Sequence, residues 1–408
     1  MNAQMKWIGG FLSLFLLMAC GNGKQNTKGG NLLDDCTVIG KVVQVGDDKV
    51  ISCDQREIKN AIRFPVSALV EDVEYIWLDN REDALVSNTR VVPSDNYLLV
   101  WGQKQNPFKL FDRKGHFITA IGSYGQGPNE YLNVYDAQLD EINNRIFLLP
   151  WQSDKILVFD LQGNSYPPIP ICIRAPKGVF HVDYANETVA VVLLPFQGLP
   201  AVAWTQDFEG NRKTYIEPEH LEAPQDYSNE VLSGRNTDVF DVSIHCIMPT
   251  RIDSLYHYDV QNNRLRPCFT MNFMDDPIPW HGYTELPNYY IGDISSPVQV
   301  ATGIFESSKR TFYIIDKQTL RGAYVQFVND LMFENIHLSH YDGFELPYFS
   351  LEYGYFIQNM EPAGILENID TAIKSGKLSD KELQELRELQ ASIHDNDNNC
   401  ILLARLKK

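Results

Sequence analysis

Residues 108–121 read FKLFDRKGHFITAI, and this order of strand, Asp, turn and strand decides the fold. The side chain of Asp112 can accept hydrogen bonds from the backbone of a tight turn, and Gly115 permits the positive φ that such a turn needs. Residues 155–171 (KILVFDLQGNSYPPIPI) and 203–216 (AWTQDFEGNRKTYI) repeat the pattern. The chain is therefore built from a recurring β-hairpin unit.

The hairpin units recur at a regular spacing. Each of the three is preceded by another apolar strand, at residues 97–100, 145–149 and 188–192. Further units occupy residues 254–269 and 311–327. Successive turns lie about 50 residues apart, which is typical of the blades of a β-propeller. A β-sandwich is the alternative, but its hairpins have no reason to recur at this period.

Counting the units predicts six blades. Five clear units lie between residues 88 and 338, and the sixth must come from the ends of the chain, where residues 73–78 and 400–406 are strand-like. Joining two terminal strands in one blade closes the ring and removes exposed edges. We therefore expect an all-β, six-bladed β-propeller over residues 36–408, with seven blades as the alternative count.

The pattern changes between residues 362 and 398. Ile365, Ile369 and Ile373 are followed by leucines at a helical spacing, and Ser379 stands where a helix N-cap is expected. Two short helices inserted into the last blade are therefore predicted. We expect them to cover a sheet edge rather than to bind a partner.

The N-terminus has the pattern of an exported, lipid-modified protein. Residues 1–19 are predicted to be a signal peptide, with Lys6 before an apolar segment that is short for a membrane span. The segment ends in Leu-Met-Ala before Cys20, which is predicted to carry the lipid. Residues 20–35 are predicted to be the lipidated Cys and a flexible tether, because most of this stretch is Gly, Asn, Lys and Gln.

Composition limits the partners and the cysteine chemistry. The net charge of −18 argues against nucleic acid and anionic headgroups as partners. Of the seven cysteines, Cys20 is assigned to lipid, and the shortest loops among the others would join Cys36 to Cys53 and Cys246 to Cys268. Free buried thiols are the open alternative, since connectivity does not follow from sequence.

One segment is distinctive, and it carries a resemblance to a known family. Residues 122–131 read GSYGQGPNEY. With residues 74–78 and 399–407 at the two ends, this loop resembles the six-bladed β-propeller lipoproteins of gut Bacteroidota, although Cys400 stands where that family has Pro. The motif residues are Gly125, Gln126, Gly127, Pro128, Glu130 and Tyr131.

The resemblance implies a lipid-anchored protein of the cell envelope. In that group, lipoproteins moved to the cell surface carry acidic residues directly after the lipidated Cys, whereas here Asp34 and Asp35 come late. The outer membrane is therefore expected, with the periplasmic face favoured over the cell surface.

The GQGP loop has two physical interpretations. Its glycines leave backbone N–H groups free, and such groups can hold an anion. The loop lacks the Lys-Ser/Thr or following helix of nucleotide-binding motifs. A structural connector between the first two blades is the favoured interpretation.

Aromatic residues give the candidate ligand-binding surface. They fall in stretches expected to be long loops, where they could stack on sugars or anchor a protein partner, namely Trp280, His281, Tyr283, Tyr289, Tyr290 and Tyr341. Packing of these rings on each other between blades is the alternative, and it is the favoured interpretation.

The sequence contains no catalytic signature of the GxSxG, HExxH or EF-hand type. No catalytic residue, metal or cofactor is therefore expected. The favoured hypothesis is a non-catalytic binding or scaffold module for a glycan, a peptide or an envelope protein. The alternative is a lyase or hydrolase that uses the central channel of the propeller.

Overall fold

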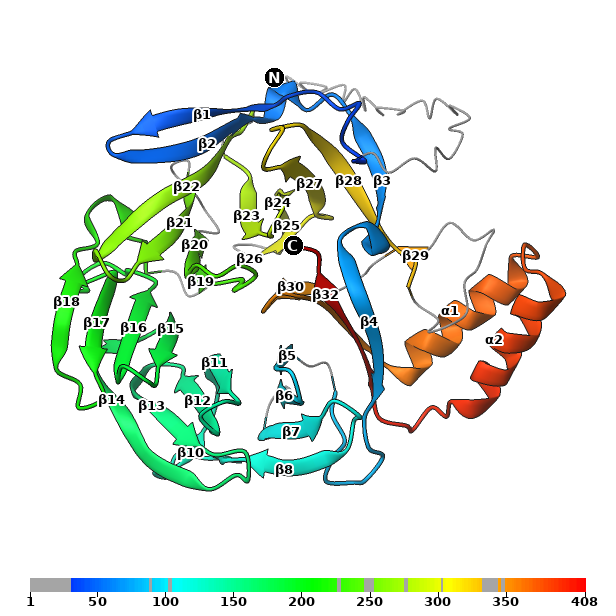
Figure 1. Cartoon of the computed structure of the whole chain (residues 1–408), viewed down its shortest axis with the longest axis horizontal. Helices are drawn as coiled ribbons and strands as arrows, with labels where there is room; N and C mark the ends of the chain where they lie inside the picture. The colour runs from blue at the N-terminus through cyan, green and yellow to red at the C-terminus, as the bar shows by residue number, and fades with distance from the viewer. Residues whose placement is uncertain are drawn as a thin grey trace, which may run out of the picture.

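The computed structural model describes residues 31–87, 90–101, 105–225, 229–245, 253–274, 278–301, 304–331, 344–345 and 349–408. Its sheets are arranged in a ring around a common centre (Figure 1). The expectation of an all-β propeller with six blades and a helical insertion in the last blade is confirmed.

The blades follow one another along the chain. Blades 1 to 3 are regular four-stranded sheets: β5 (Arg90–Pro93), β6 (Tyr97–Trp101), β7 (Phe108–Asp112) and β8 (Phe117–Ile121); β11 (Val134–Asp140), β12 (Arg145–Pro150), β13 (Ser153–Phe159) and β14 (Ser165–Ala175); β15 (Gly178–Asp183), β16 (Thr188–Leu193), β17 (Ala203–Asp207) and β18 (Arg212–Ile216).

Blades 4 to 6 each contain, besides their own strands, one or two strands from the N-terminal part of the chain. Their own strands are β19 (Glu230–Leu232), β20 (Asp241–His245), β21 (Ser254–Asp259) and β22 (Arg264–Asn272); β23 (Trp280–Glu285), β24 (Tyr289–Ser295), β27 (Thr311–Asp316), β28 (Gly322–Asn329) and the short β29 (Phe344–Glu345); β30 (Ser350–Glu352), β31 (Tyr355–Met360) and β32 (Cys400–Leu406). Two short strands, β9 (Ser123–Tyr124) and β10 (Glu130–Tyr131), connect blades 1 and 2.

The apolar runs form strands that are buried on both faces. In β6, Leu98, Leu99 and Val100 are all fully buried. Successive side chains of a strand point to opposite faces. Leu99 accordingly packs in the core shared with blade 2, whereas Leu98 and Val100 pack in the core shared with blade 6. Among the described residues, each contact between adjacent blades holds one such hydrophobic cluster.

The repeated Asp forms the same turn in three blades. The carboxylate of Asp112 accepts hydrogen bonds from the backbone N–H groups of Lys114 (2.8 Å) and His116 (3.0 Å), and Asp160 and Asp207 cap their turns in the same way. The glycines of these turns have φ of 87°, 85° and 85°. The Asp-capped turn with a Gly at positive φ, which the sequence repeat predicts, is therefore present in the structure.

An N-terminal strap, residues 38–77, lies on the outer edges of blades 4, 5 and 6 (Figure 1). It consists of β1 (Gly40–Val45), β2 (Asp48–Asp54), β3 (Ala61–Pro65) and β4 (Val70–Trp77). Strand β2 pairs in parallel with β22, and β3 pairs in parallel with β28. Strand β4 pairs antiparallel with β32 and closes the ring, as the terminal strands of the sequence predicted.

Some residues expected in the tether contact the propeller. Residues 20–35 were assigned to a flexible segment, yet Leu33 is fully buried in the cluster between blades 5 and 6. The side-chain amide of Asn31 also donates a 2.6 Å hydrogen bond to Asp316. The expected signal peptide and Cys20 lie outside the described residues.

The helices α1 (Pro362–Lys374) and α2 (Asp380–Ser392) occur between β31 and β32, outside the ring (Figure 1). Ser379 is the N-cap of α2 and forms a capping box with Glu382. Ile365 and Ile369 of α1 and Leu386 of α2 pack into the cluster between blades 5 and 6. Within the described part of the chain, no helix combines the length and apolar character needed to cross a bilayer.

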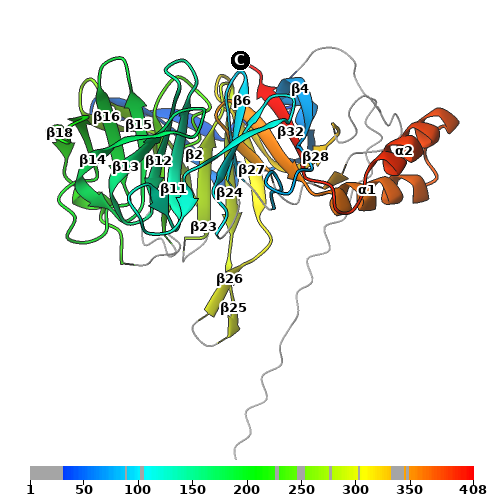
Figure 2. The same cartoon turned by 90° about the horizontal axis from the view of Figure 1, so that it is seen from below.

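A second insertion, a two-stranded hairpin, extends from blade 5. The hairpin of β25 (Pro297–Ala301) and β26 (Ile304–Ser307) occurs between β24 and β27 and projects from one face of the ring (Figure 2). Val298 and Val300 on this hairpin are exposed.

The turn of blade 1 generates a test of ring closure. A Cβ at Gly115 would lie 1.9 Å from the carbonyl oxygen of Trp77, at the end of β4. Gly115→Ala should lower the free energy of unfolding by about 1–3 kcal/mol more than Gly198→Ala, because overpacking adds to the cost of a positive φ. Gly198 has a matching φ of +88° and open space around it. Equal losses in urea denaturation would contradict the proposed contact.

Candidate functional site

The inner strands β5, β11, β15, β19, β23 and β30 surround the centre of the ring (Figure 1). A cavity of about 270 Å³ lies there, lined by residues from five of these strands. Ion pairs from different blades border it: Arg90 with Glu352 at 3.5 Å, Lys177 with Glu230 at 2.5 Å, and Arg235 with Asp136 at 2.5 Å. The central charges therefore join blades together.

Arg235 makes the most extensive of these connections. Its guanidinium donates two hydrogen bonds to Asp136 in β11, one to the carbonyl of Phe180 in β15, and one to the hydroxyl of Tyr353 after β30. Burial by itself would lower the pKa of Arg235, but the charge of Asp136 raises it well above its usual value. Arg235 therefore stays charged and ties blade 4 to blades 2, 3 and 6.

A larger cleft of about 770 Å³ lies between blades 3 and 4. Phe240 on its wall has the ring of His181 at 6.2 Å and the ring of Tyr258 at 6.1 Å between centroids. Burial, and then the charge of Arg235, lowers the pKa of His181, so this imidazole is neutral near pH 7. The cleft therefore presents an aromatic wall with a neutral polar group beside it.

Polar groups without partners border the same cleft. The hydroxyl of Thr237 is buried and has no hydrogen-bond partner. Asp238 is exposed, and neither its carboxylate nor the guanidinium of Arg266 forms a hydrogen bond or close ion pair with any described residue. Arg266 lies close enough to Asp259 for its charge to lower the pKa of that carboxyl. Buried polar groups normally find a partner, so the Thr237 hydroxyl beside these charged side chains offers hydrogen-bonding capacity to a polar molecule.

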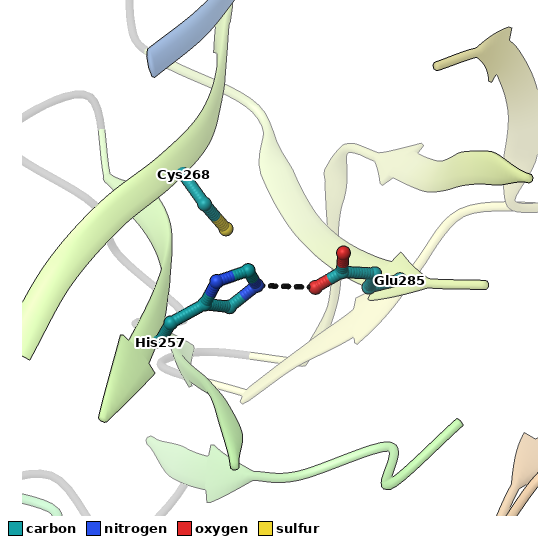
Figure 3. A group of neighbouring side chains, drawn as sticks. All are labelled: His257, Cys268 and Glu285. Carbon is teal, nitrogen blue, oxygen red and sulfur yellow. Dashed lines mark hydrogen bonds and ion pairs between the residues drawn. The ribbon is translucent and has the colours of Figure 1, made fainter. Parts of the chain in front are cut away.

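Three side chains of metal-binding type meet beside this cleft (Figure 3). His257 comes from β21, Cys268 from β22, and Glu285 from the end of β23 in the next blade. Their ligand atoms all lie within 4.8 Å of one another. His257 also lines the cleft, so it connects this cluster to the cleft surface.

Hydrogen bonds and burial set the charge state of the cluster. The ring of His257 lies 2.5 Å from one oxygen of Glu285, and the ammonium of Lys317 lies 2.6 Å from the other. Burial would raise the pKa of Glu285, but these two partners outweigh it and lower the pKa. Burial, followed by the nearby charges of Glu285 and Asp241, raises the pKa of Cys268, which is therefore a thiol.

The aromatic residues predicted as a ligand surface lie elsewhere. Most belong to strands rather than long loops: Trp280, His281 and Tyr283 are in β23, and Tyr289 and Tyr290 are in β24. All except Tyr289, which is partly buried, are buried, and Tyr290 stacks on Phe269 at 4.5 Å. The prediction of loop positions is wrong here, and Tyr283, Tyr289 and Tyr290 pack in the hydrophobic clusters between blades. Tyr341 lies outside the described residues.

The GQGP loop closes on itself. The carboxylate of Glu130 accepts a 2.7 Å hydrogen bond from the backbone N–H of Gly127, and a Cβ at Gly125 would meet the same carboxylate at 2.0 Å. The hydroxyl of Tyr131 accepts from the N–H of Phe108 and donates to the carbonyl of Ile121. The carboxylate of Glu130 therefore already accepts from the backbone N–H of Gly127, which an anion bound in the loop would need as a donor.

Two of the cysteines expected to pair are free thiols in the propeller. Cys36 and Cys53 are both free, so the pairing of Cys36 with Cys53 is wrong, whereas Cys246 of the other expected pair lies outside the described residues. Cys36 packs in the cluster between blades 5 and 6, whereas Cys53 packs in the one between blades 4 and 5. A short loop in sequence does not bring them together in space.

The closed ring of six sheets, with its first strand completing the last blade, defines a six-bladed β-propeller. The chain belongs to the family described as Domain of unknown function (DUF4934), whose model matches residues 48–405. No curated protein matches the sequence.

Two solved structures from Bacteroides are similar to this chain. One is assigned as an exported protein of Bacteroides fragilis NCTC 9343, with 16% identity, a TM-score of 0.56, and coverage of 88% of this chain and 100% of that one. The other is a member of the duf4221 family from Bacteroides vulgatus, with 11% identity, a TM-score of 0.42, and coverage of 83% and 97%. The first shows the same fold at low identity.

The central ion pair generates a prediction on stability. The side chain of Asp136 is 6% exposed and that of Arg235 is 16% exposed. Arg235→Ala should therefore lower the free energy of unfolding by about 3–5 kcal/mol, because it leaves a buried carboxylate unpaired. Arg81→Ala, at an exposed ion pair with Asp83, should cost less than about 1 kcal/mol. Similar losses for the two variants in chemical denaturation would contradict this assignment.

Proposed function

We propose that this protein is an exported lipoprotein whose propeller binds a glycan, without catalysis, in the cleft between blades 3 and 4. The observation that carries the proposal is the set of polar groups around Phe240, namely the unsatisfied hydroxyl of Thr237 and the charged side chains of Asp238 and Arg266. Sugars offer an apolar ring face and many hydroxyl groups, so they match an aromatic wall bordered by donors and acceptors. The volume of about 770 Å³ is within the range of small-molecule sites.

The location of the protein is part of the same proposal. The N-terminal sequence supports export and a lipid on Cys20, with attachment to the outer membrane and the periplasmic face favoured. The assignment of the similar Bacteroides fragilis protein as exported supports the same compartment. A cleft that faces away from the cytoplasm would meet envelope glycans, and peptides or envelope proteins are the other ligands to test.

The competing hypothesis of an enzyme in the central channel has less support. Arg90, Lys177 and Arg235 around the channel are each paired with a carboxylate of another strand or blade. Charges that are held in this way stabilise the ring and are less available for acid–base chemistry. The binding cleft is therefore favoured over the channel as the functional site.

Glycan binding is tested with a panel of neutral and acidic oligosaccharides, followed by calorimetry on any that bind. Phe240→Ala and Asp238→Asn should each weaken binding by about tenfold or more, because they remove stacking or a hydrogen-bond acceptor. Tyr124→Ala, which removes a 43% exposed aromatic ring in the connection between blades 1 and 2, should leave the affinity unchanged. Binding only to peptides, or equal effects of all three variants, would count against the proposal.

The lipid anchor is tested by replacing Cys20. Cys20→Ala should abolish incorporation of labelled fatty acid and release the protein from the membrane fraction, because the acyl chains are the expected attachment. Cys172→Ala is the matched control, since Cys172 is an exposed thiol within the propeller. If the Cys20 variant stays with the membranes and keeps its label, the anchor lies elsewhere.

A further inference from the structure

We propose that His257, Cys268 and Glu285 form a binding site for one divalent ion of the zinc class, with a coordination position open towards the cleft. This inference is independent of glycan binding. It starts from the combination of an imidazole, a thiol and a carboxylate on three strands whose ligand atoms lie within 4.8 Å of one another (Figure 3). Zn²⁺ is bound in proteins by this set of nitrogen, sulfur and oxygen donors.

The donor set selects among metals. A soft sulfur ligand disfavours Mg²⁺ and Ca²⁺, which prefer oxygen, and a nitrogen–sulfur–oxygen site suits Zn²⁺ or Co²⁺. His257 offers Nε2 and Glu285 offers the oxygen next to it, which are 2.5 Å apart. That separation is a hydrogen bond, so an ion would take the place of the proton between them, and the two groups would move apart slightly.

Binding also requires the thiol of Cys268 to ionise. Its proton passes to solvent as the sulfur–metal bond forms. The proton between Nε2 of His257 and Glu285 also leaves, to solvent or to Nδ1 of the same ring, so that His257 coordinates through an unprotonated Nε2. The thiol now donates to the carbonyl oxygen of Leu255 at 3.2 Å, a weak interaction to lose, and it also interacts with the side chain of Tyr290, which favours the thiolate. No oxidation or reduction takes place in this step.

The surroundings of the cluster hold its ligands in position. Lys317 binds the outer oxygen of Glu285 at 2.6 Å and lies 4.8 Å from the centre of the Tyr290 ring, which leaves the other carboxylate oxygen to the ion. The positive charge of Lys317 opposes metal binding. The carboxylate of Asp241 lies near both Cys268 and Glu285, and burial raises its pKa. A cation at the cluster would favour its charged form, and that charge would in turn favour the cation.

The position of His257 determines what reaches the ion. This residue lines the cleft between blades 3 and 4, and its side chain is 18% exposed. Three protein ligands leave a tetrahedral ion with one free position, which a water molecule or a ligand in the cleft would occupy. A site of this form differs from a closed structural zinc site with four protein ligands.

Cobalt titration of the purified, metal-stripped full chain tests the site. We expect one equivalent of Co²⁺ to produce a sulfur-to-cobalt charge-transfer band and the visible bands of four-coordinate cobalt, and Zn²⁺ to abolish both. Cys268→Ser should remove the charge-transfer band. His257→Gln and Glu285→Gln should weaken Zn²⁺ binding by about tenfold or more.

Two controls keep the result interpretable. Cys172→Ser removes an exposed thiol elsewhere and should change neither the spectrum nor the affinity. Circular dichroism and thermal melting of each variant establish that it is folded before titration. The proposal is overturned if the folded wild-type chain gives no charge-transfer band, or if Cys268→Ser leaves the band in place. Oligosaccharide binding is measured separately, so its failure would not affect this conclusion.

Discussion

The antiparallel pairing of β4 with β32 is the constraint on which the rest of the structure depends. It runs from Trp77 opposite Cys400 to Val70 opposite Leu406 and joins residues from the two ends of the chain in one sheet. A propeller blade is apolar on both faces, so it is stable only between two other blades. If this pairing opened, the clusters on both sides of blade 6 would lose packing, and the central ion pair of Arg90 with Glu352 would separate.

The parts of the fold that depend on local chemistry could be predicted from the sequence. The Asp-capped turns and their period identify the blades, because each turn is formed by residues within a few positions of each other. The strap could not be predicted beyond β4. Strands β2 and β3 add to blades far away in sequence, and their pairing depends on edges that exist only after the ring has formed.

The candidate site was less accessible to sequence reasoning for a related reason. His257, Cys268 and Glu285 lie on three successive strands, and no fixed spacing relates positions on neighbouring strands and blades. The aromatic residues of β23 and β24 were placed on loops because polar residues and Gly interrupt both strands, so neither shows the apolar run or the strict alternation by which a strand is recognised. Both cases are decided by tertiary contacts rather than by residue type.

The N-terminal strap also determines how a pulling force on the segment before residue 31 would reach the ring. Such tension would first load the hydrogen bond of Asn31 to Asp316 and the bridge of Val38 to Arg321, both on blade 5. It would next load β2 on blade 4 and β3 on blade 5, and only then β4. The strand β4 that closes the ring is thus mechanically shielded. A force applied to the N-terminal segment would have to break the contacts of Asn31, Val38, β2 and β3 before it reached β4 and opened the ring.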